Sequence, residues 1–268
     1  MGAHYGVAVT ARSSAPGVVD VVAAALGEEL AAIRARVDGA AAPRVLDVGG
    51  GSGTWAVPLA AQGCEVTVVD SSANALAVLR SRARDAGVAD RVRAVQGDVD
   101  ALADVPDVPD HAGDRRGAAD LVLGHGLLEY VDDPAAAVRA LAAAVAPGGA
   151  VSILVAGRWA AVLARVVAGR VAEARRLLTD PAGRWGSGDP LLRRMDTDEI
   201  RALLEHDGGL VVEQIRGHRV LADLVPEAPD GVAGAADLAA LEALAADTPP
   251  LRDLASRIHV MARRPVGR

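Results

Sequence analysis

The chain of 268 residues contains no phenylalanine, no lysine and only one cysteine. Aromatic residues make up 2 % of the sequence, so few rings are available to stack on bases or on flat substrates. The lone Cys64 excludes an intrachain disulfide, which fits a reducing compartment. Apolar runs are short, with 141–145 cut off by Pro147-Gly148-Gly149, and the first residues lack a basic stretch followed by an apolar core. We therefore expect a cytoplasmic protein without a membrane partner.

The charge balance is acidic, with a formal net charge of −7, and all 28 basic residues are arginine. This balance gives no overall attraction to nucleic acid or to anionic lipid, although a local arginine patch can still form. Hydrophobic residues make up 51 % and charged residues 24 %, which excludes a wholly disordered chain. The histidines are dispersed without the spacing of metal ligands, so the sequence predicts no metal site.

Short runs rich in valine and leucine alternate with helical patterns from residue 45 onward. The expected strands are 45–48, 65–69, 92–96, 121–123, 150–155, 211–215 and 258–263, and the helices between them are 54–61, 73–86 and 134–145. A further helix is expected after Asp196 or Thr197, either of which can cap it. Strands that alternate with helices form a parallel sheet covered on both faces. The sequence therefore predicts an α/β fold with a doubly wound, mostly parallel sheet of seven strands.

Three segments lie outside this alternation. Residues 1–40 are expected to form an N-terminal arm and an amphipathic helix, ahead of a main domain over 41–268. Residues 157–195 carry scattered arginines among small apolar residues, which predicts a helical insertion over the carboxyl edge of the sheet. Residues 220–255 are rich in alanine, aspartate and proline, which predicts a second insertion made of a loop and one short helix.

A glycine-rich loop follows the first expected strand, which ends near Asp47. Its glycines are Gly49, Gly50, Gly51 and Gly53. Without Cβ atoms they let backbone amides approach a ligand, and the following helix points its N-terminal amides at the loop. Such a loop is typical of a nucleotide cofactor site, although any doubly wound protein needs glycines at this turn. The loose G-x-G-x-x-G/A pattern over 51–56, with Asp70 as a ribose-binding acid, keeps NAD open as an alternative.

The acid before the loop favours a different cofactor. The order acid-x-G-x-G-x-G that starts at Asp47 resembles motif I of the class I S-adenosylmethionine-dependent methyltransferases. Further signals follow in that family's order: Asp70-Ser71 closes the second strand, Asp98-Val99 follows the third, and Pro147-Gly148-Gly149 precedes the fifth. The resemblance implies a Rossmann-like fold and S-adenosyl-L-methionine as the cofactor. It also implies that Asp70 binds the ribose hydroxyls and that Asp98 binds the adenine amine.

A narrower resemblance covers most of residues 44–265. The stretch 125–134, the segment 167–169 and the ending 257–265 resemble the bacterial methyltransferases that esterify 5-carboxymethoxyuridine at the tRNA wobble position. This resemblance implies a carboxylate as the methyl acceptor and places His125 beside the cofactor; the alternative is that His125 only caps the next helix. The expected cofactor-binding residues are then Asp47, Gly49, Gly50, Gly51, Gly53, Asp70, Ser71, Asp98, Val99 and His125.

The chain departs from that narrower family at two places. The family's N-terminal helix carries a basic residue that reaches the cofactor carboxylate, whereas 16–20 has none, and Arg12 is the available substitute. The family's lysine-rich insertion is replaced by scattered arginines, which also fit solvated helix faces. Since tRNA affinity normally comes from aromatic stacking and from neutralised phosphates, a small-molecule acceptor stays open beside tRNA.

No catalytic residue stands out in the sequence. A carboxylate acceptor is ionised at neutral pH and needs no strong base, whereas His125 can serve as the base for a hydroxyl or an amine. Arg158 or Arg184 can hold a carboxylate bidentately. Three functions stay open: a tRNA carboxyl methyltransferase, a small-molecule O- or N-methyltransferase of secondary metabolism, and a non-catalytic cofactor-binding protein. Neither the methyl acceptor nor the oligomeric state follows from the sequence.

Overall fold

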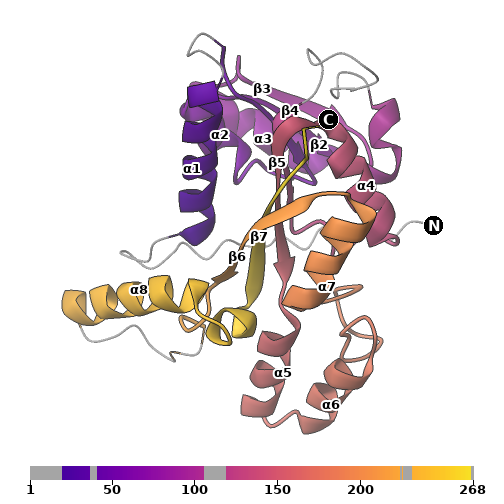
Figure 1. Ribbon diagram of the computed structural model, residues 1–268, viewed down its shortest axis with the longest axis vertical. Helices are drawn as coiled ribbons and strands as arrows, with labels where there is room; N and C mark the ends of the chain where they lie inside the picture. Colours follow the sequence, from indigo (N-terminus) through magenta and orange to yellow (C-terminus); the bar gives the residue numbers. More distant parts are fainter. Residues whose placement is uncertain (1–19, 37–40, 106–118, 224, 226–230, 267–268) are drawn as a thin grey trace.

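The computed structural model describes residues 20–36, 41–105, 119–223, 225 and 231–266, and Figure 1 shows their arrangement. The described strands form one seven-stranded sheet in the order β3-β2-β1-β4-β5-β7-β6. They are β1 (Arg44–Val48), β2 (Glu65–Asp70), β3 (Val92–Gln96), β4 (Ala119–His125), β5 (Val145–Ala156), β6 (Val211–His218) and β7 (Arg257–Arg263). β1 to β5 pair in parallel, and β7 runs antiparallel to both β5 and β6. The predicted α/β fold with a mostly parallel sheet is confirmed.

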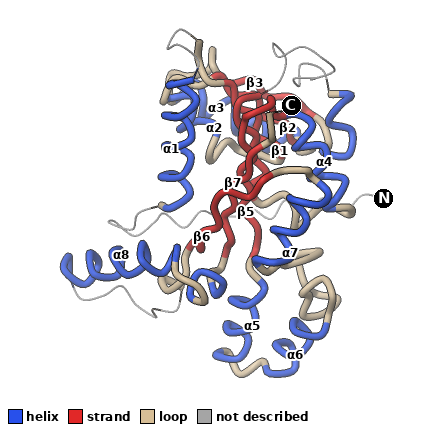
Figure 2. Tube along the Cα trace, viewed as in Figure 1, coloured by secondary structure: helices blue, strands red, loops and turns tan. Residues whose placement is uncertain are grey.

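Helices cover both faces of this sheet, as Figure 2 shows. One face carries α1 (Val21–Arg36), α2 (Ala56–Ala61) and α3 (Ala73–Asp85). The other face carries η1 (Val99–Asp104), α4 (Pro134–Ala144) and α7 (Thr197–Ala202), which continues into the π-helical turn η2 (Leu203–Asp207). The architecture therefore has three layers, with the sheet between two layers of helices.

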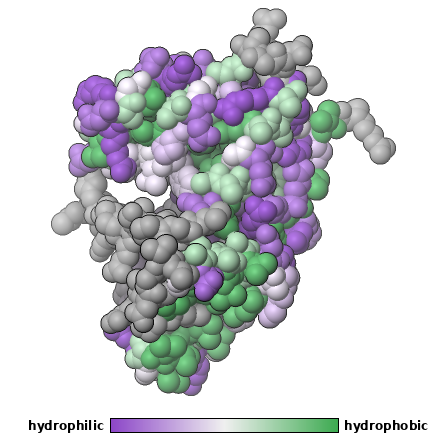
Figure 3. Space-filling view, turned by 90° about the vertical axis from the view of Figure 1, so that its left-hand side faces the viewer, coloured by the Kyte–Doolittle hydropathy of each residue, from purple (hydrophilic) through white to green (hydrophobic). Residues whose placement is uncertain are grey.

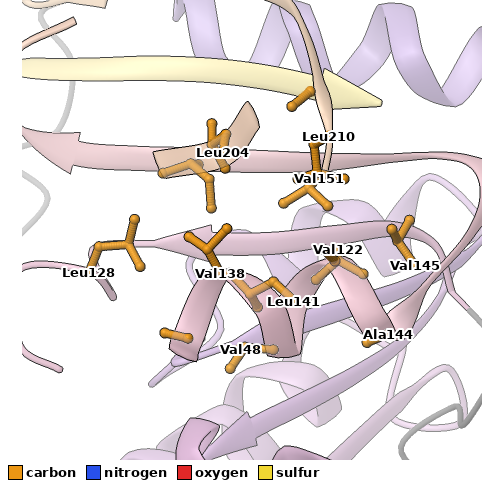
Figure 4. Close-up of a cluster of buried hydrophobic side chains, with 14 of the residues drawn as sticks. Val48, Val122, Leu128, Val138, Leu141, Ala144, Val145, Val151, Leu204 and Leu210 are labelled. Atoms are coloured by element: carbon orange, nitrogen blue, oxygen red, sulfur yellow. The ribbon is translucent and has the colours of Figure 1, made fainter. Parts of the chain in front are cut away.

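Each layer of helices packs on the sheet through a buried apolar core. On the α4 face, Val122 of β4 and Val151 of β5 pack in one core with Leu141 of α4 and Leu204 of η2, all fully buried (Figure 4). Burying a side chain of this size contributes about 1.5–3 kcal/mol relative to leaving it exposed. Because the strands are covered on both faces, their sequences are apolar in succession rather than alternating.

Side-chain caps set where helices begin. Asp133 precedes α4 and accepts a hydrogen bond from the amide of Ala136 at 2.9 Å. The expected cap of α7 at Asp196 is confirmed, because its Oδ1 accepts from the amide of Glu199 at 2.9 Å. The Glu199 carboxylate accepts in return from the amide of Asp196, which completes a capping box. A cap of this kind contributes about 1 kcal/mol.

Ion pairs attach α1 to the end of the sheet formed by β6 and β7. Glu29 of α1 is 6 % exposed, and its Oε2 accepts from Nη2 of Arg263 at 2.7 Å. Arg263 also pairs with Glu213 of β6 at 2.6 Å, and Arg36 reaches the other oxygen of Glu29 at 3.0 Å. Hydrogen bonds to Glu29 and Glu213 raise the pKa of the Arg263 guanidinium. This network positions α1, whose first turn lies at the carboxyl edge of the sheet.

Residues 157–195, expected as a helical insertion, contain α5 (Arg158–Val167) and α6 (Val171–Thr179). Two ion pairs hold the insertion, each at 2.6 Å: Arg158 with the partly exposed Glu199, and Arg194 with the buried Asp189. Its large exposed apolar residues are Val166, Val167, Val171, Leu178 and Leu192. Figure 3 shows apolar surface gathered at this lower end of the molecule. None of the helices that the structure describes is both long and apolar enough to cross a membrane.

Two expected boundaries differ from the structure. The helix expected at 54–61 begins only at Ala56, because the residues before it form turns. The turn expected at Pro147-Gly148-Gly149 is an irregularity within β5: its pairing with β4 passes from Ala119↔Val145 to Leu121↔Ala150. The glycines let the strand bulge here, with a φ of +78° at Gly148.

The last insertion is more helical than expected. Within 220–255 the structure has α8 (Gly231–Asp247), of 17 residues, followed by η3 (Leu251–Leu254). Alanine and leucine, both strong helix formers, outweigh the single interior glycine at 234. The expected N-terminal arm and its Arg12 lie outside the described residues.

Candidate functional site

The glycine loop joins β1 to α2 at the carboxyl edge of the sheet. Positive φ angles occur at Gly49, Gly51 and Gly53. At Gly50 the requirement is steric, because a Cβ atom would lie 2.4 Å from Oδ2 of Asp47 and 2.9 Å from Cγ1 of Val68. A side chain at Gly50 would push the loop away from the strand end, so the loop geometry itself requires glycine there.

Asp70 ties this loop to the end of β2. Its Oδ2 accepts a hydrogen bond from the amide of Gly51 at 2.9 Å, and its Oδ1 accepts one from the amide of Ser72 at 2.8 Å. A carboxylate offers about four lone-pair sites, so about two remain for a ligand. Asp70 can therefore hold the loop and still accept hydrogen bonds from ligand hydroxyls.

A cavity of about 230 Å³ opens at this edge beside Asp70. The predicted cofactor residues in its wall are Gly49, Asp70, Ser71, Asp98 and Val99; Asp47, Gly50, Gly51, Gly53 and His125 are not part of it. Asp98 also begins η1, where its Oδ1 accepts from the amide of Asp100 at 3.2 Å. The wall residues that sequence reasoning missed after β4 are Leu127, Tyr130, Val131 and Asp132. They lie in the stretch 125–134, of which only His125 was predicted to bind the cofactor.

Asp47 lies beneath the loop and is 1 % exposed. Neither of its carboxylate oxygens has a hydrogen-bond partner among the described residues. Burial, reinforced by the negative charge of Asp70, raises the pKa of Asp47 to about 7. Because a buried acid without a partner is unfavourable, this position suits a ligand that brings a positive charge or an N–H donor to the loop.

These acids fit S-adenosylmethionine better than a dinucleotide. S-adenosylmethionine has an ammonium and a sulfonium group at its amino-acid end and a ribose and an adenine at the other. The unpartnered Asp47 matches the cationic end, and Asp70 and Asp98 in the cavity wall match the hydroxyls and the amine. A pyrophosphate at the same loop would meet the negative charge of Asp70. The arrangement therefore disfavours NAD.

His125 ends β4 at the same edge of the sheet. Its Nε2 lies 2.8 Å from Oγ of Ser152 on β5, and that Oγ lies 2.8 Å from Nε2 of His259 on β7. Burial, followed by the charges of its neighbours, lowers the pKa of His125 well below its ordinary value, and burial lowers the pKa of His259 to about 3. Both imidazoles are therefore neutral at pH 7. Since Asp133 caps α4, the alternative that His125 caps it is wrong.

Arginines hold the segment that follows β4. Glu129 is 1 % exposed, and its Oε1 accepts from the amide of Ala156 at 3.2 Å and from Nη1 of Arg257 at 3.3 Å. Burial raises the pKa of Glu129. Arg193 donates to the carbonyl of Asp132 at 2.9 Å. These bonds fix the part of the cavity wall that sequence reasoning missed.

Of the two arginines expected to meet an anionic acceptor, Arg158 is engaged elsewhere, and Arg257 is a further candidate. Arg158 is buried, and its Nη2 donates to Glu199 at 2.6 Å and to the carbonyl of Pro181 at 2.8 Å, so it is engaged inside the insertion. Arg257 makes one hydrogen bond to the described residues, and its side chain is 26 % exposed at the edge beside Gly126. Nothing in the linear sequence brings residue 257 next to residue 126; the strand order does.

Comparison with known proteins gives relatives over different lengths. A family model described as a methyltransferase domain matches residues 22–216. Ubiquinone biosynthesis O-methyltransferase of Pectobacterium carotovorum (strain PC1) is 39 % identical over 117 residues, which are 44 % of this chain and 44 % of that protein. The match thus spans less than half the length of this relative. The tRNA 5-carboxymethoxyuridine methyltransferase of Escherichia coli (strain K12) is 28 % identical over 222 residues, 83 % of this chain and 80 % of that protein.

Solved structures share the fold. A S-adenosylmethionine-dependent methyltransferase from Methanosarcina mazei superposes with a TM-score of 0.55 at 17 % identity. The superposition covers 84 % of this chain and 94 % of the other. At this identity the likeness concerns the fold alone.

Proposed function

Because this chain belongs to the methyltransferase domain family, we propose that it transfers a methyl group from S-adenosyl-L-methionine to an oxygen atom of its acceptor. The methyltransferase domain family supports the transfer, and the cofactor is inferred from the site. The observation that carries the cofactor site is the buried, unpartnered Asp47 beneath a glycine loop that Asp70 anchors. The oxygen acceptor is what the proposal adds.

Different side chains of the chain would bind different parts of the cofactor. Asp70 would accept hydrogen bonds from the ribose hydroxyls and Asp98 from the adenine amine, since both line one cavity. Asp47 would face the cationic amino-acid end. The cofactor, when bound, supplies a methyl group on a positively charged sulfur. Leu127 and Val131 give the cavity apolar surface that excludes water, so positioning and electrostatics would provide most of the rate enhancement.

A carboxylate is one acceptor that fits. Support comes from the tRNA 5-carboxymethoxyuridine methyltransferase relative, which is similar over 83 % of this chain. Arg257 adds support, because a guanidinium at the sheet edge can bind a carboxylate bidentately. A carboxylate is already ionised at neutral pH and attacks without a base.

A hydroxyl of a small molecule is the second acceptor that fits. Support comes from the O-methyltransferase relative at 39 % identity over 44 % of this chain. His125 adds support, because a neutral imidazole at the carboxyl edge can take a proton from a hydroxyl.

Labelled methyl transfer separates these acceptors. The purified chain is incubated with methyl-labelled S-adenosylmethionine and either bulk tRNA or a small-molecule extract, and the product is then treated with mild base. A methyl ester releases labelled methanol, whereas a methyl ether keeps its label. Calorimetry with S-adenosylmethionine, S-adenosylhomocysteine and NAD accompanies the assay. Binding of NAD without binding of the sulfur compounds would refute the cofactor, and firm cofactor binding without any transfer would favour a non-catalytic protein.

A further inference from the structure

One arginine of the insertion binds three carbonyl groups of the segment that follows β4. The Nη1 atom of Arg193 donates to the carbonyl of Leu128 at 2.9 Å and also to the carbonyl of Val131. Its Nη2 atom donates to the carbonyl of Asp132 at 2.9 Å. A guanidinium has five N–H donors in a fixed planar arrangement and no acceptor, so it suits a group of carbonyls that converge on one point.

The preceding residue of the insertion completes this attachment. The amide of Leu192 donates to the carbonyl of Glu129 at 2.9 Å. Every carbonyl from residue 128 to residue 132 except that of Tyr130 therefore accepts a hydrogen bond from residue 192 or 193. The side chain of Glu129 adds a bond to the sheet, because its Oε1 accepts from the amide of Ala156 at the end of β5 at 3.2 Å. The segment is thus held both by the insertion and by the sheet.

This segment forms part of the cavity wall although it is neither helix nor strand. Residues 126–133 form turns and bends between β4 and α4. Those that line the cavity of about 230 Å³ are Leu127, Tyr130, Val131 and Asp132. Ordering an irregular segment costs backbone entropy, so a ligand that must order its own site binds more weakly. Bonds that hold the wall before the ligand arrives therefore increase affinity without contacting the ligand.

The insertion leaves the sheet and returns to it at one place beside this wall. It begins at Gly157, directly after β5, and ends at Met195, and these two residues form a parallel bridge. The amide of Met195 donates to the carbonyl of Ala156 at 3.1 Å, and the amide of Arg158 donates to the carbonyl of Met195 at 3.0 Å. Arg193 lies two residues before this return point. Its guanidinium reaches the wall only while the end of the insertion stays on the sheet edge.

The charge of Arg193 gives this contact a role that packing alone does not explain. Burial lowers the pKa of the Arg193 guanidinium, and nearby carboxylates, that of Asp132 first, oppose this effect. Taking a guanidinium out of water is unfavourable, and an apolar side chain would fill the same space without that penalty. The guanidinium supplies donors in fixed directions, which decide where the carbonyls of the wall point. Because each peptide group is planar, these directions also fix the neighbouring side chains that face the cavity.

We propose that Arg193 is a positioning residue for cofactor binding, which holds residues 128–132 as a wall for the adenosine half of S-adenosylmethionine. The inference rests on the proposed function and gives the insertion a part in cofactor affinity. The adenosine half is concerned because the wall shares its cavity with Asp70 and Asp98, the residues proposed to bind the ribose and the adenine amine. Arg193 is not itself part of the cavity wall, so it acts on the cofactor through the carbonyls that it binds.

Calorimetry on the full chain tests the affinity. Arg193→Met keeps much of the apolar stem but removes the donors, so S-adenosylhomocysteine should bind at least about tenfold more weakly. Methylthioadenosine, which lacks the amino-acid end, should lose affinity by the same factor, because the wall concerns the adenosine half. Arg193→Lys should recover part of the affinity, since an ammonium donates from one atom rather than from a fork. Arg201→Met, which removes an exposed arginine paired with Glu205 on the surface, is the matched control and should bind as the wild type does.

Hydrogen exchange and kinetics test how Arg193 acts. Without ligand, amides in 127–132 should exchange at least about tenfold faster in Arg193→Met than in the wild type or in Arg201→Met, because the wall opens more often. The amide of Tyr130, which donates to the carbonyl of Leu127 at 3.0 Å, belongs to this group. With an acceptor in hand, the KM for S-adenosylmethionine should rise at least about tenfold while kcat stays within about threefold, since Arg193 does not line the cavity. Protection of the sheet amides reports whether the variants fold.

Failures of the two proposals are distinguishable. Unchanged affinity for S-adenosylhomocysteine in folded Arg193→Met would overturn the positioning role and leave the proposed function standing. A loss for S-adenosylhomocysteine without a loss for methylthioadenosine would overturn it as well, because the wall would then not meet the adenosine half. If Arg193→Met does not fold, Arg193→Lys carries the same comparison. A wild type that binds neither compound would overturn the proposed function, and the positioning role with it.

Discussion

Asp70 connects the glycine loop, the end of β2 and the cavity, so replacing it should affect cofactor binding and stability separately. Asp70→Ala removes the acceptor for the amides of Gly51 and Ser72, which lie 2.9 and 2.8 Å from its two oxygens. It also removes the two lone pairs that would meet the ribose hydroxyls. Hydrogen bonds to a charged group contribute about 1.5–3 kcal/mol each in favourable cases. We expect S-adenosylhomocysteine to bind about 30- to 150-fold more weakly, which corresponds to about 2–3 kcal/mol.

Calorimetry measures this loss of affinity, and denaturant unfolding measures how much Asp70 stabilises the glycine loop. Because two backbone amides lose their acceptor, the free energy of unfolding should also fall by about 1–3 kcal/mol. Asp90→Ala is the matched control, since Asp90 is an exposed acid just before the opposite, amino end of β3. If Asp70→Ala lowers stability but leaves the affinity within about threefold of wild type, Asp70 serves the loop alone and the assignment of the ribose site is wrong.

Three further changes test the fold around the site. The pKa of Asp47 is about 7 in the folded chain against an ordinary 3.8, so ionisation of Asp47 opposes folding. In denaturant unfolding, the free energy of unfolding of Asp47→Asn should rise relative to that of the wild type by up to about 4 kcal/mol as pH rises from about 4 to 7. A difference in stability that does not depend on pH would contradict this. Gly27→Ala in α1 should stabilise by about 0.5–1 kcal/mol in thermal melts, because its Cβ meets nothing within 4 Å; a loss would mean that α1 packs differently. Arg263→Met should cost about 3 kcal/mol in the same melts by leaving the buried Glu29 poorly paired, whereas Arg139→Met at an exposed pair should cost less than about 1 kcal/mol. Equal losses of stability in Arg263→Met and Arg139→Met would show that the ion pair between Arg263 and Glu29 does not hold α1 in place.

Local patterns predicted the strands and the glycine loop well. Strands buried on both faces are apolar in succession, and a loop that bends beneath a ligand needs glycine. Both features therefore produce a recognisable sequence pattern within a few residues. The acids at strand ends could be placed together as well, because parallel strands bring their carboxyl ends to one edge. Asp70 and Asp98 accordingly line one cavity.

Contacts between distant strands could not be predicted in this way. Ser152 is 27 residues from His125 and 107 residues from His259, and only the order β4-β5-β7 brings them together. The prediction that Arg158 binds an acceptor carboxylate failed for the same reason. The sequence does not reveal which of the scattered arginines packs against Glu199. The bulge at Pro147-Gly148-Gly149 was interpreted as a turn because proline and glycine signal both, and the choice depends on the pairing with β4.

The absence of lysine has a consequence for the ion pairs of this fold. Arg263 with Glu29, and Arg194 with Asp189, are held by guanidinium groups, which stay charged throughout the range in which proteins remain folded. No side-chain amine within these 268 residues can be acetylated, conjugated or deprotonated in moderate alkali. The ion pairs that attach α1 to β6 and β7 and the buried pair in the insertion therefore cannot be released by acylation of a lysine amine.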